Sequence, residues 1–338
     1  MTSTRGRFLA AGAATGAFAS IGMLRWPGDA AQFNFKLGND QTPTHPMNVA
    51  TNDAVKRIAE ATHGAVDIKV FGTSLLGGDT QMIQQLRSGA LEFMQAGNNI
   101  LGAVIPAASL LSVPFAFKSP AQYQSAANGT LGAYIANAGA ALGIRKFETG
   151  FYGGFFEIQN RVRPINTPAD LAGLKIRVPA GPLDVGTFKA LDASPTVINL
   201  SEVYTSLQTH LVDGIEVPLP TVRNFKFYEQ VKYCSLTHHS GLTYMLFANS
   251  DVWSKLPKNL QEVVDREFNA AAAEASRTMS SQETSFETEL TGKGMVFNRP
   301  ALEPFAAKIR ASGLYAQLRG QYDAKAWDVL EKTTGKLV

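Results

Sequence analysis

Apolar residues recur at helical spacing in several segments of this chain, and a short apolar run that predicts a strand follows each segment. In the first segment Asp79 or Thr80 caps a helix, Gly89 ends it, and residues 91–95 follow as a strand. Helices and strands that alternate in this way indicate parallel sheets flanked by helices. The pattern therefore predicts an α/β protein.

The same order, a capped helix followed by a short strand, occurs twice more in the middle of the chain. Thr167 caps a short helix that opens at Pro168 and ends at Gly173, and residues 175–178 form the strand. A further helix begins after Ser201 and leads into a third strand at residues 215–217. Its predicted apolar face consists of Val203, Leu207 and Leu211.

The other elements suggest how two domains are joined. An early strand, helix and strand are predicted at residues 33–39, 47–62 and 66–71. Residues 145–160 and 241–250 are extended and apolar, and we expect them to cross between the domains. Residues 259–289 contain no Pro or Gly and predict one helix of about 30 residues, which would span ~45 Å and brace both domains.

Length and composition agree with a water-soluble globular protein of two α/β domains. The chain has 338 residues, of which 45% are hydrophobic and 17% are charged. Residues 1–29 hold three arginines and one aspartate, so their removal lowers the net charge from +3 to +1, far from that of a nucleic-acid binder. The single cysteine, Cys234, excludes an internal disulfide and a cysteine-based metal cluster, and its apolar neighbours predict a buried thiol.

Residues 1–31 have the three-part pattern of an export signal, with Arg5 and Arg7, an apolar stretch and a run of small residues. The start resembles a twin-arginine signal except for Gly6 between the arginines, so twin-arginine and general secretion both stay open. A membrane anchor is the alternative, but the apolar stretch falls short of the ~20 residues that a spanning helix needs. We expect a processed protein in a bacterial periplasm that does not span the membrane.

Motifs for catalysis are weak. The sequence has no Gly-x-Ser-x-Gly turn and no His-Glu-x-x-His spacing, and residues 76–79 are too short for a phosphate-binding loop. His238 and His239 are adjacent, and adjacent residues on a strand point to opposite faces. We therefore predict a protein that is not an enzyme and that has no cofactor and no catalytic or metal site.

Arg177 stands in the middle of the apolar strand Leu-Lys-Ile-Arg-Val-Pro. Burying a guanidinium is costly unless it meets an anion, and its planar donor fork suits a carboxylate. Two partners are equally open on this spacing: an internal Asp or Glu, or the carboxylate of a ligand.

Several motifs in a fixed order give this strand a context. The chain from residue 33 to residue 330 resembles the substrate-binding proteins of TRAP (tripartite ATP-independent periplasmic) transporters, in the group that binds dicarboxylates and sialic acid. The segments that carry the resemblance are residues 44–50, 71–93, 112–117, 164–179 and 194–220.

The resemblance implies a two-lobed α/β fold of the type II-like periplasmic binding protein, with hinge strands and a long helix spanning both lobes. One lobe would comprise residues 32–154 and 243–282, and the other residues 155–242 and 283–338. It further implies that the lobes close around a small organic acid. A monomeric protein would then deliver this acid to the TRAP permease subunits in the membrane, driven by a sodium gradient.

The resemblance also assigns site residues. Arg177 matches the arginine that binds the ligand carboxylate, and Glu216 matches a polar pocket position that in some members binds the ligand through a cation. Pocket positions in loops of the first lobe correspond to Asn39, Gln41, Asn98 and Asn99. A backbone cap or turn is an equally open role for the residues other than Arg177.

Two departures from the family pattern narrow the expected ligand. Members that take larger or doubly anionic acids often carry a second arginine where this chain has Phe155, Phe156 and Glu157, and Val217 replaces an asparagine of sialic-acid binders. We expect Phe156 and Val217 to line the pocket, and Glu157 either to accept hydrogen bonds from ligand hydroxyls or an ammonium, or to face solvent. The predicted ligand is a monocarboxylate, such as a hydroxy acid, a keto acid or a sugar acid.

Three other functions stay open. The chain would also suit the binding protein of an ATP-driven importer, which has a similar two-lobed architecture. A periplasmic enzyme would need an acid–base or nucleophile cluster, and a sensor would present its bound solute to a receptor.

Overall fold

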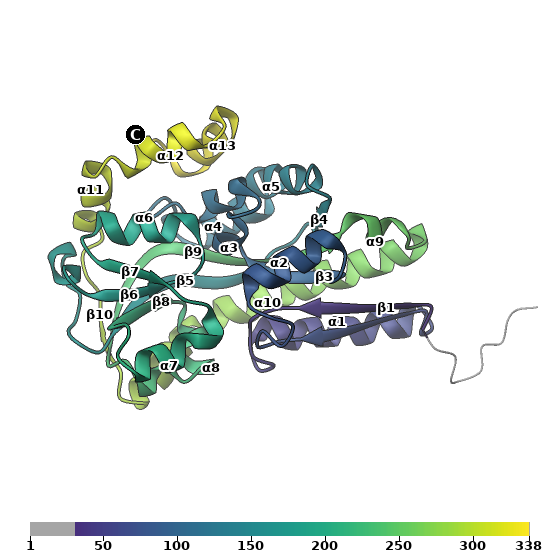
Figure 1. Ribbon diagram of the computed structural model, residues 1–338, viewed down its shortest axis with the longest axis horizontal. Helices are drawn as coiled ribbons and strands as arrows, with labels where there is room; N and C mark the ends of the chain where they lie inside the picture. The colour runs from purple at the N-terminus through teal and green to yellow at the C-terminus, as the bar shows by residue number, and fades with distance from the viewer. Residues whose placement is uncertain (1–30, 338) are drawn as a thin grey trace, which may run out of the picture. The chain divides into compact units, whose positions relative to one another are not determined.

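A ten-stranded sheet organises residues 31–337, the part of the chain that the computed structural model describes (Figure 1). The predicted export signal lies outside these residues, apart from Ala31. The strands follow the order β2-β1-β3-β9-β5-β8-β6-β7, and β4 and β10 both pair with β9. The protein is thus of the α/β class that the sequence predicts, with helices on both sides of the sheet (Figure 1).

The elements of the first half of the chain have the following bounds. The strands are β1 (Phe33–Gly38), β2 (Val66–Phe71), β3 (Phe93–Gly97), β4 (Ile144–Lys146) and β5 (Phe151–Asn160). The α-helices are α1 (Pro46–Ala61), α2 (Asp79–Ser88), α3 (Asn98–Leu101), α4 (Pro120–Asn128) and α5 (Thr130–Ala140), and η1 (Pro106–Ser112) is a 3₁₀ helix.

The second half continues the alternation. Its strands are β6 (Lys175–Val178), β7 (Ser194–Val197), β8 (Gly214–Val217), β9 (Tyr233–Asn249) and β10 (Val296–Asn298). Its α-helices are α6 (Pro182–Ala190), α7 (Val203–Gln208), α8 (Leu219–Asn224), α9 (Ser250–Ser254), α10 (Lys258–Gly292), α11 (Glu303–Ala311), α12 (Leu314–Gln321) and α13 (Ala324–Thr334). Three further 3₁₀ helices are η2 (Pro168–Leu171), η3 (Leu200–Glu202) and η4 (Phe227–Glu229).

The sheet is mixed, not purely parallel as the helix–strand alternation suggested. β1 is parallel to β2 and β3, and β6 is parallel to β7 and β8. Between these two parallel groups lie β5 and β9, which pair antiparallel with each other. β5 covers only residues 151–160 of the first predicted crossing segment, and β9 begins before the second segment and ends one residue short of its end. The two strands are antiparallel because the chain passes from one group to the other in β5 and returns in β9.

The long helix α10 lies against both parallel groups. It has 35 residues, which corresponds to about 50 Å, and it packs on α1 of the first group and on α8 and β10 of the second. Its buried positions recur at helical spacing and include Val264, Phe268, Met279, Phe286 and Leu290. The predicted helix at residues 259–289 is confirmed and is slightly longer than expected.

Three local predictions about caps and helix ends were wrong in detail. The N-cap of α2 is Gly78 and not Asp79 or Thr80, and the Gly78 amide donates to the Gln81 side chain at 3.1 Å. Ser201 lies inside the 3₁₀ helix η3 and does not cap α7. α7 ends at Gln208, so that Leu211 lies beyond it and is 56% exposed.

Other local predictions are confirmed. Gly89 ends α2 in the left-handed region with φ 76°, and the strand at residues 175–178 has the predicted bounds. Cys234 is a free, buried thiol in β9.

The close approach of β9 to helix α4 predicts a cost for adding one methyl group. A Cβ at Gly241 would lie within 2.2–2.6 Å of three ring atoms of Tyr123, which is fully buried. We expect Gly241→Ala to lower the free energy of unfolding by ~1–3 kcal/mol, because the packed ring has no room to move aside. Urea denaturation would measure the change.

Gly320→Ala is the matched control. Gly320 lies in α12, and a Cβ at this position would point into open space, so alanine should leave stability unchanged or raise it by up to ~1 kcal/mol. Equal stability of Gly241→Ala and the unaltered protein would contradict the packing described for β9.

Candidate functional site

Arg177 lies in β6 with 3% of its surface exposed. Its Nε donates to the backbone oxygen of Ile198 at 2.8 Å. Within residues 31–337 this is the one hydrogen bond of the guanidinium, and no ion pair involves it. The structural salt bridge that the sequence left open is therefore not formed among the described residues, although the side chain is buried.

Four buried carboxyl groups surround Arg177 at longer range, and their charges act on it: Glu216, Asp79, Asp40 and Asp184. Burial raises the pKa of Asp40 from 3.8 to about 6 and raises those of Asp79, Asp184 and Glu216 well above their ordinary values. The charge of Arg177 opposes each of these shifts. One guanidinium does not balance four carboxylates, so the burial of this cluster favours the protonated form of its carboxyl groups.

Five of the predicted site residues line one small cavity of about 30 Å³: Gln41, Asn99, Phe156, Arg177 and Val217. Its other walls come from Asp40, Gly97, Ile100, Pro179, Leu200, Pro218, Thr221, Leu242 and Tyr244. Asp40, Thr221 and Tyr244 add further polar groups. Asp40 lies in the loop at residues 39–42, which the family resemblance assigns to the ligand-facing side, whereas Thr221 and Tyr244 were not predicted from the sequence.

Two acceptor atoms of this cavity's lining have no hydrogen-bond partner within residues 31–337. They are Oε1 of Gln41 and Oδ1 of Asn99, and both are buried. The amide nitrogen of Gln41 donates to Asp40 at 3.2 Å, and that of Asn99 donates to Asp184 at 3.5 Å. A buried acceptor without a donor is costly, so these two oxygens are suited to donors that a ligand supplies.

Glu216 lies deeper and pairs with a histidine. Its Oε2 lies 2.7 Å from Nε2 of His239, and both side chains are almost completely buried. Burial raises the pKa of Glu216 and lowers that of His239 to about 4. Within residues 31–337 no group of three or more acidic, histidine or cysteine side chains is arranged to hold a metal ion.

Asn39 and Asn98 lie outside the cavity lining and brace the loops that form it. The side chains of Asn39 and Asn48 exchange two hydrogen bonds, of 2.7 and 3.1 Å. The Asn39 side chain also accepts one from the backbone N–H of Gln41 at 3.0 Å. Asn98 donates to Ser112 at 2.7 Å and accepts from the amide of Thr243 at 2.8 Å. Asn39 therefore positions Gln41, which lines the cavity, and Asn98 ties the start of α3, next to Asn99, to η1 and β9.

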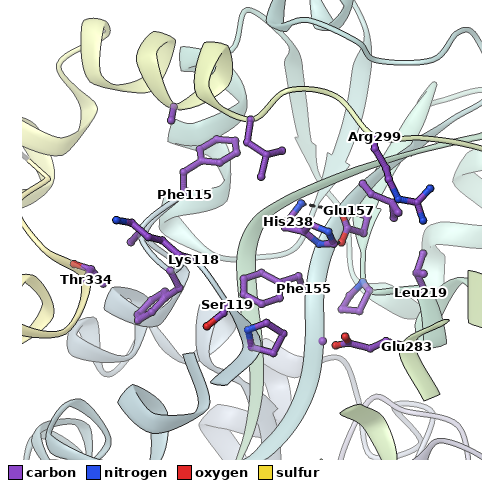
Figure 2. A pocket seen from close by; sticks show the side chains of 18 of the residues that line it. Phe115, Lys118, Ser119, Phe155, Glu157, Leu219, His238, Glu283, Arg299 and Thr334 are labelled. Atoms are coloured by element: carbon purple, nitrogen blue, oxygen red, sulfur yellow. Dashed lines mark hydrogen bonds and ion pairs between the residues drawn. The ribbon is translucent and has the colours of Figure 1, made fainter. Parts of the chain in front are cut away.

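Glu157 lies apart from Arg177, on the lining of a second cavity of about 910 Å³ (Figure 2). It is 3% exposed, so it does not face open solvent. It accepts from the amide of His238 at 2.8 Å, and it lies 2.5 Å from Nδ1 of that histidine. His238 and His239 thus pair with different carboxylates, and the predicted opposite orientation of the two side chains is confirmed.

The raised pKa of Asp40 predicts a pH-dependent effect on stability. The folded protein binds the Asp40 proton up to about pH 6 and the unfolded chain only up to about pH 3.8, so Asp40 favours folding less as the pH rises through this range. Asp40→Asn removes this titration, and we expect its stability relative to the unaltered protein to increase by up to ~3 kcal/mol between pH 4 and 7. Urea denaturation at several pH values would measure it.

Asp251→Asn, at an exposed position, is the control for this series. It removes one carboxylate outside the cavity and so measures the effect of the charge change alone. A difference for Asp40→Asn that follows the same course with pH as that of the control would show that the Asp40 carboxyl is not protonated in the folded protein at pH 5.

No helix within residues 31–337 is both long and apolar enough to cross a membrane.

Comparison with known proteins places the chain in a family. The sequence model of the family described as bacterial extracellular solute-binding protein, family 7, matches residues 37–317. The 2,3-diketo-L-gulonate-binding periplasmic protein of Escherichia coli is 31% identical over 231 residues, which are 68% of this chain and 70% of that protein. An uncharacterized protein of Sinorhizobium fredii is 34% identical over 272 residues, and the match spans 80% of this chain but only 49% of that protein.

Solved structures that resemble this protein support the same family assignment. A TRAP periplasmic solute-binding protein of Chromohalobacter salexigens with bound D-glucuronate is 28% identical, with a TM-score of 0.84 over 89% of this chain and 99% of that chain. One from Roseobacter denitrificans with bound L-galactonate is also 28% identical, with a TM-score of 0.83 over 90% of this chain and 99% of that chain. The predicted two-lobed fold is confirmed by this similarity. The chain belongs to family 7 of the bacterial extracellular solute-binding proteins, the binding proteins of TRAP transporters.

Proposed function

We propose that this protein captures a sugar acid with a single carboxylate and delivers it to TRAP permease subunits. One observation carries the proposal: Arg177 is buried and has no carboxylate partner within residues 31–337, and it lines the same cavity as the unpartnered acceptors of Gln41 and Asn99. The guanidinium fork would bind the ligand carboxylate through two parallel hydrogen bonds. Ligand hydroxyls would donate to the two amide oxygens.

The arrangement of donors and acceptors supports a hydroxylated ligand over a simple fatty or dicarboxylic acid. The lining offers one cationic group, Arg177, so a second ligand carboxylate would meet only the acidic side of the cluster. D-Glucuronate and L-galactonate, which the two structural relatives bind, combine one carboxylate with several hydroxyls. The predicted monocarboxylate is therefore narrowed to a sugar acid.

We further propose that the lobes comprise residues 32–154 with 243–282 and residues 155–242 with 283–338. The small cavity takes walls from both sets, with Gln41 and Asn99 on one side and Arg177 and Val217 on the other. Its volume of about 30 Å³ corresponds to roughly one water molecule, so a sugar acid enters only after the lobes separate. Closure onto the ligand would then form contacts on both sides at once.

We infer that the role is capture and not catalysis, because the members of this family are solute-binding proteins. The mature chain would work as a periplasmic monomer after removal of the export signal, residues 1–31. Nuclear magnetic resonance of the bound sugar acid tests the absence of turnover: chemical conversion over hours would assign an enzymatic role instead.

Arg177→Ala should abolish measurable binding of D-glucuronate in isothermal titration calorimetry. Removing the guanidinium leaves the ligand carboxylate with no cationic partner in the cavity, and we expect affinity to fall by at least ~100-fold. Arg177→Lys keeps the charge but not the planar fork, and should recover only part of the loss. Unchanged affinity of Arg177→Ala would make the arginine structural and remove the proposal.

Arg319→Ala serves as the control, because Arg319 is an exposed arginine of α12 outside the cavity lining. It changes the net charge equally and should bind D-glucuronate like the unaltered protein. Circular dichroism of all variants separates loss of binding from loss of folding.

Asn99→Leu tests whether the side-chain oxygen of Asn99 accepts a hydrogen bond from a ligand hydroxyl. The substitution removes the Asn99 Oδ1 acceptor and should weaken D-glucuronate binding about tenfold, the cost of one lost buried hydrogen bond. The same substitution should leave the weaker binding of cyclohexanecarboxylate, which has a carboxylate and no hydroxyls, nearly unchanged. Equal losses for both ligands would show that Asn99 does not recognise hydroxyls.

A further inference from the structure

The larger cavity of about 910 Å³ lies apart from the Arg177 cavity, although the same two strands contribute to both. In β5, Phe155 and Glu157 line the larger cavity, and Phe156 between them lines the smaller one. In β9, His238 lines the larger cavity, while the adjacent His239 turns to Glu216. Side chains that alternate along a strand point to opposite faces, so at residues 155–157 of β5 the two cavities lie on opposite faces of the strand.

The walls of the larger cavity are mainly apolar. Phe115, Phe155, Leu236, Met279, Phe286 and Tyr315 contribute to them. These side chains come from β5, β9, α10, α12 and the loop before α4, and the last residues of α13 and of the C-terminal segment complete the lining. A volume of this size with apolar walls from several elements is typical of a small-molecule site.

Most charged groups of this lining already have partners. Glu157 pairs with His238, Arg299 with Glu287, Arg310 with Glu303, and Lys336 with Glu331. Two charges remain. Within residues 31–337 the ammonium of Lys118 has neither an ion-pair nor a hydrogen-bond partner, and the carboxylate of Glu283 accepts from the Tyr152 hydroxyl at 2.7 Å but pairs with no cation.

These two charges lie on either side of an apolar surface. Figure 2 shows Phe155 between Lys118 on the left and Glu283 at the lower right, with Phe115 above. A ligand that covers Phe155 would thus have the exposed Lys118 to one side and the half-buried Glu283 to the other, neither in an ion pair within residues 31–337.

Backbone strain is also concentrated at this cavity. Phe115 and His238 both line it and both have positive φ values, 55° and 42°, which bulky residues rarely adopt. The pairing of β5 and β9 shifts register next to Glu157, between Phe156 and Ile158. Strained residues and strand irregularities of this kind gather at functional sites.

We propose that this cavity is a second ligand site, for a zwitterion whose carboxylate and ammonium are joined by an apolar body. Its carboxylate would pair with Lys118, its ammonium with Glu283, and its body would cover Phe155. The site does not share the binding groups of the sugar-acid site, since Arg177, Gln41 and Asn99 do not line it.

Three probes with the same eight-carbon body test the proposal: 8-aminooctanoate, octanoate and octylammonium. Titrations followed by ¹H–¹⁵N nuclear magnetic resonance would give dissociation constants and locate binding by the amides that shift. We expect 8-aminooctanoate to bind about fivefold more tightly than either singly charged probe, the factor that corresponds to ~1 kcal/mol for a partly exposed ion pair. The shifted amides should include those of Lys118, Phe155 and His238.

Two variants test which charged end of the ligand pairs with Lys118 and which pairs with Glu283. Lys118→Gln should weaken 8-aminooctanoate about fivefold and leave octylammonium unchanged, and Glu283→Gln should weaken 8-aminooctanoate by a similar factor and leave octanoate unchanged. Both variants should bind D-glucuronate like the unaltered protein. Arg177→Ala should lose D-glucuronate but bind 8-aminooctanoate normally, so failure of one site is distinguishable from failure of the other.

Equal affinities of the three probes for the unaltered protein would overturn the proposal. So would shifts confined to the amides of Gln41 and Asn99, because they would place the probe in the sugar-acid site. Ala306→Trp is a further test, since it would fill part of the cavity from α11 and should weaken all three probes.

Discussion

The burial of Arg177 without a carboxylate in contact is the constraint on which the rest of the binding site depends. A guanidinium loses hydration when it is buried, and its single hydrogen bond within the described part of the chain, to Ile198, does not replace that hydration. Four carboxyl groups at longer range offset part of the cost, and burial in turn makes them hold protons more tightly. Within residues 31–337 the guanidinium therefore stays without an anion in contact, which supports the proposal that its donor fork binds a ligand carboxylate.

The other polar groups of the cavity lining complement the buried Arg177. Gln41 and Asn99 use their side-chain amide nitrogens within the protein, and among residues 31–337 their side-chain oxygens have no partner, so the lining combines one donor fork with several acceptors. Such a lining matches a ligand with one acid group and several hydroxyls. Asn39 and Asn98, behind the lining, hold the two loops in place through hydrogen bonds to neighbouring side chains and backbone amides.

The strands β5 and β9 connect this site to the rest of the molecule. They join two parallel groups of strands, and α10 packs against elements of both groups. Both strands supply walls to two cavities, and because side chains alternate at residues 155–157 of β5, the two cavities lie on opposite faces of that strand. Residues that are adjacent in sequence, such as Phe155 and Phe156 or His238 and His239, thus have different surroundings.

The sequence by itself determined the α/β class, the order of most elements, the long helix and the position of Arg177 in a buried strand, because these follow from local periodicity, capping and the motif order. It did not determine which pocket candidates share a cavity, since Glu157 and Glu216 have the same charge and similar neighbours in the chain. Only the tertiary structure paired them with His238 and His239 on different faces. The partners of these side chains come from strands distant in sequence, and no local pattern encodes such pairing.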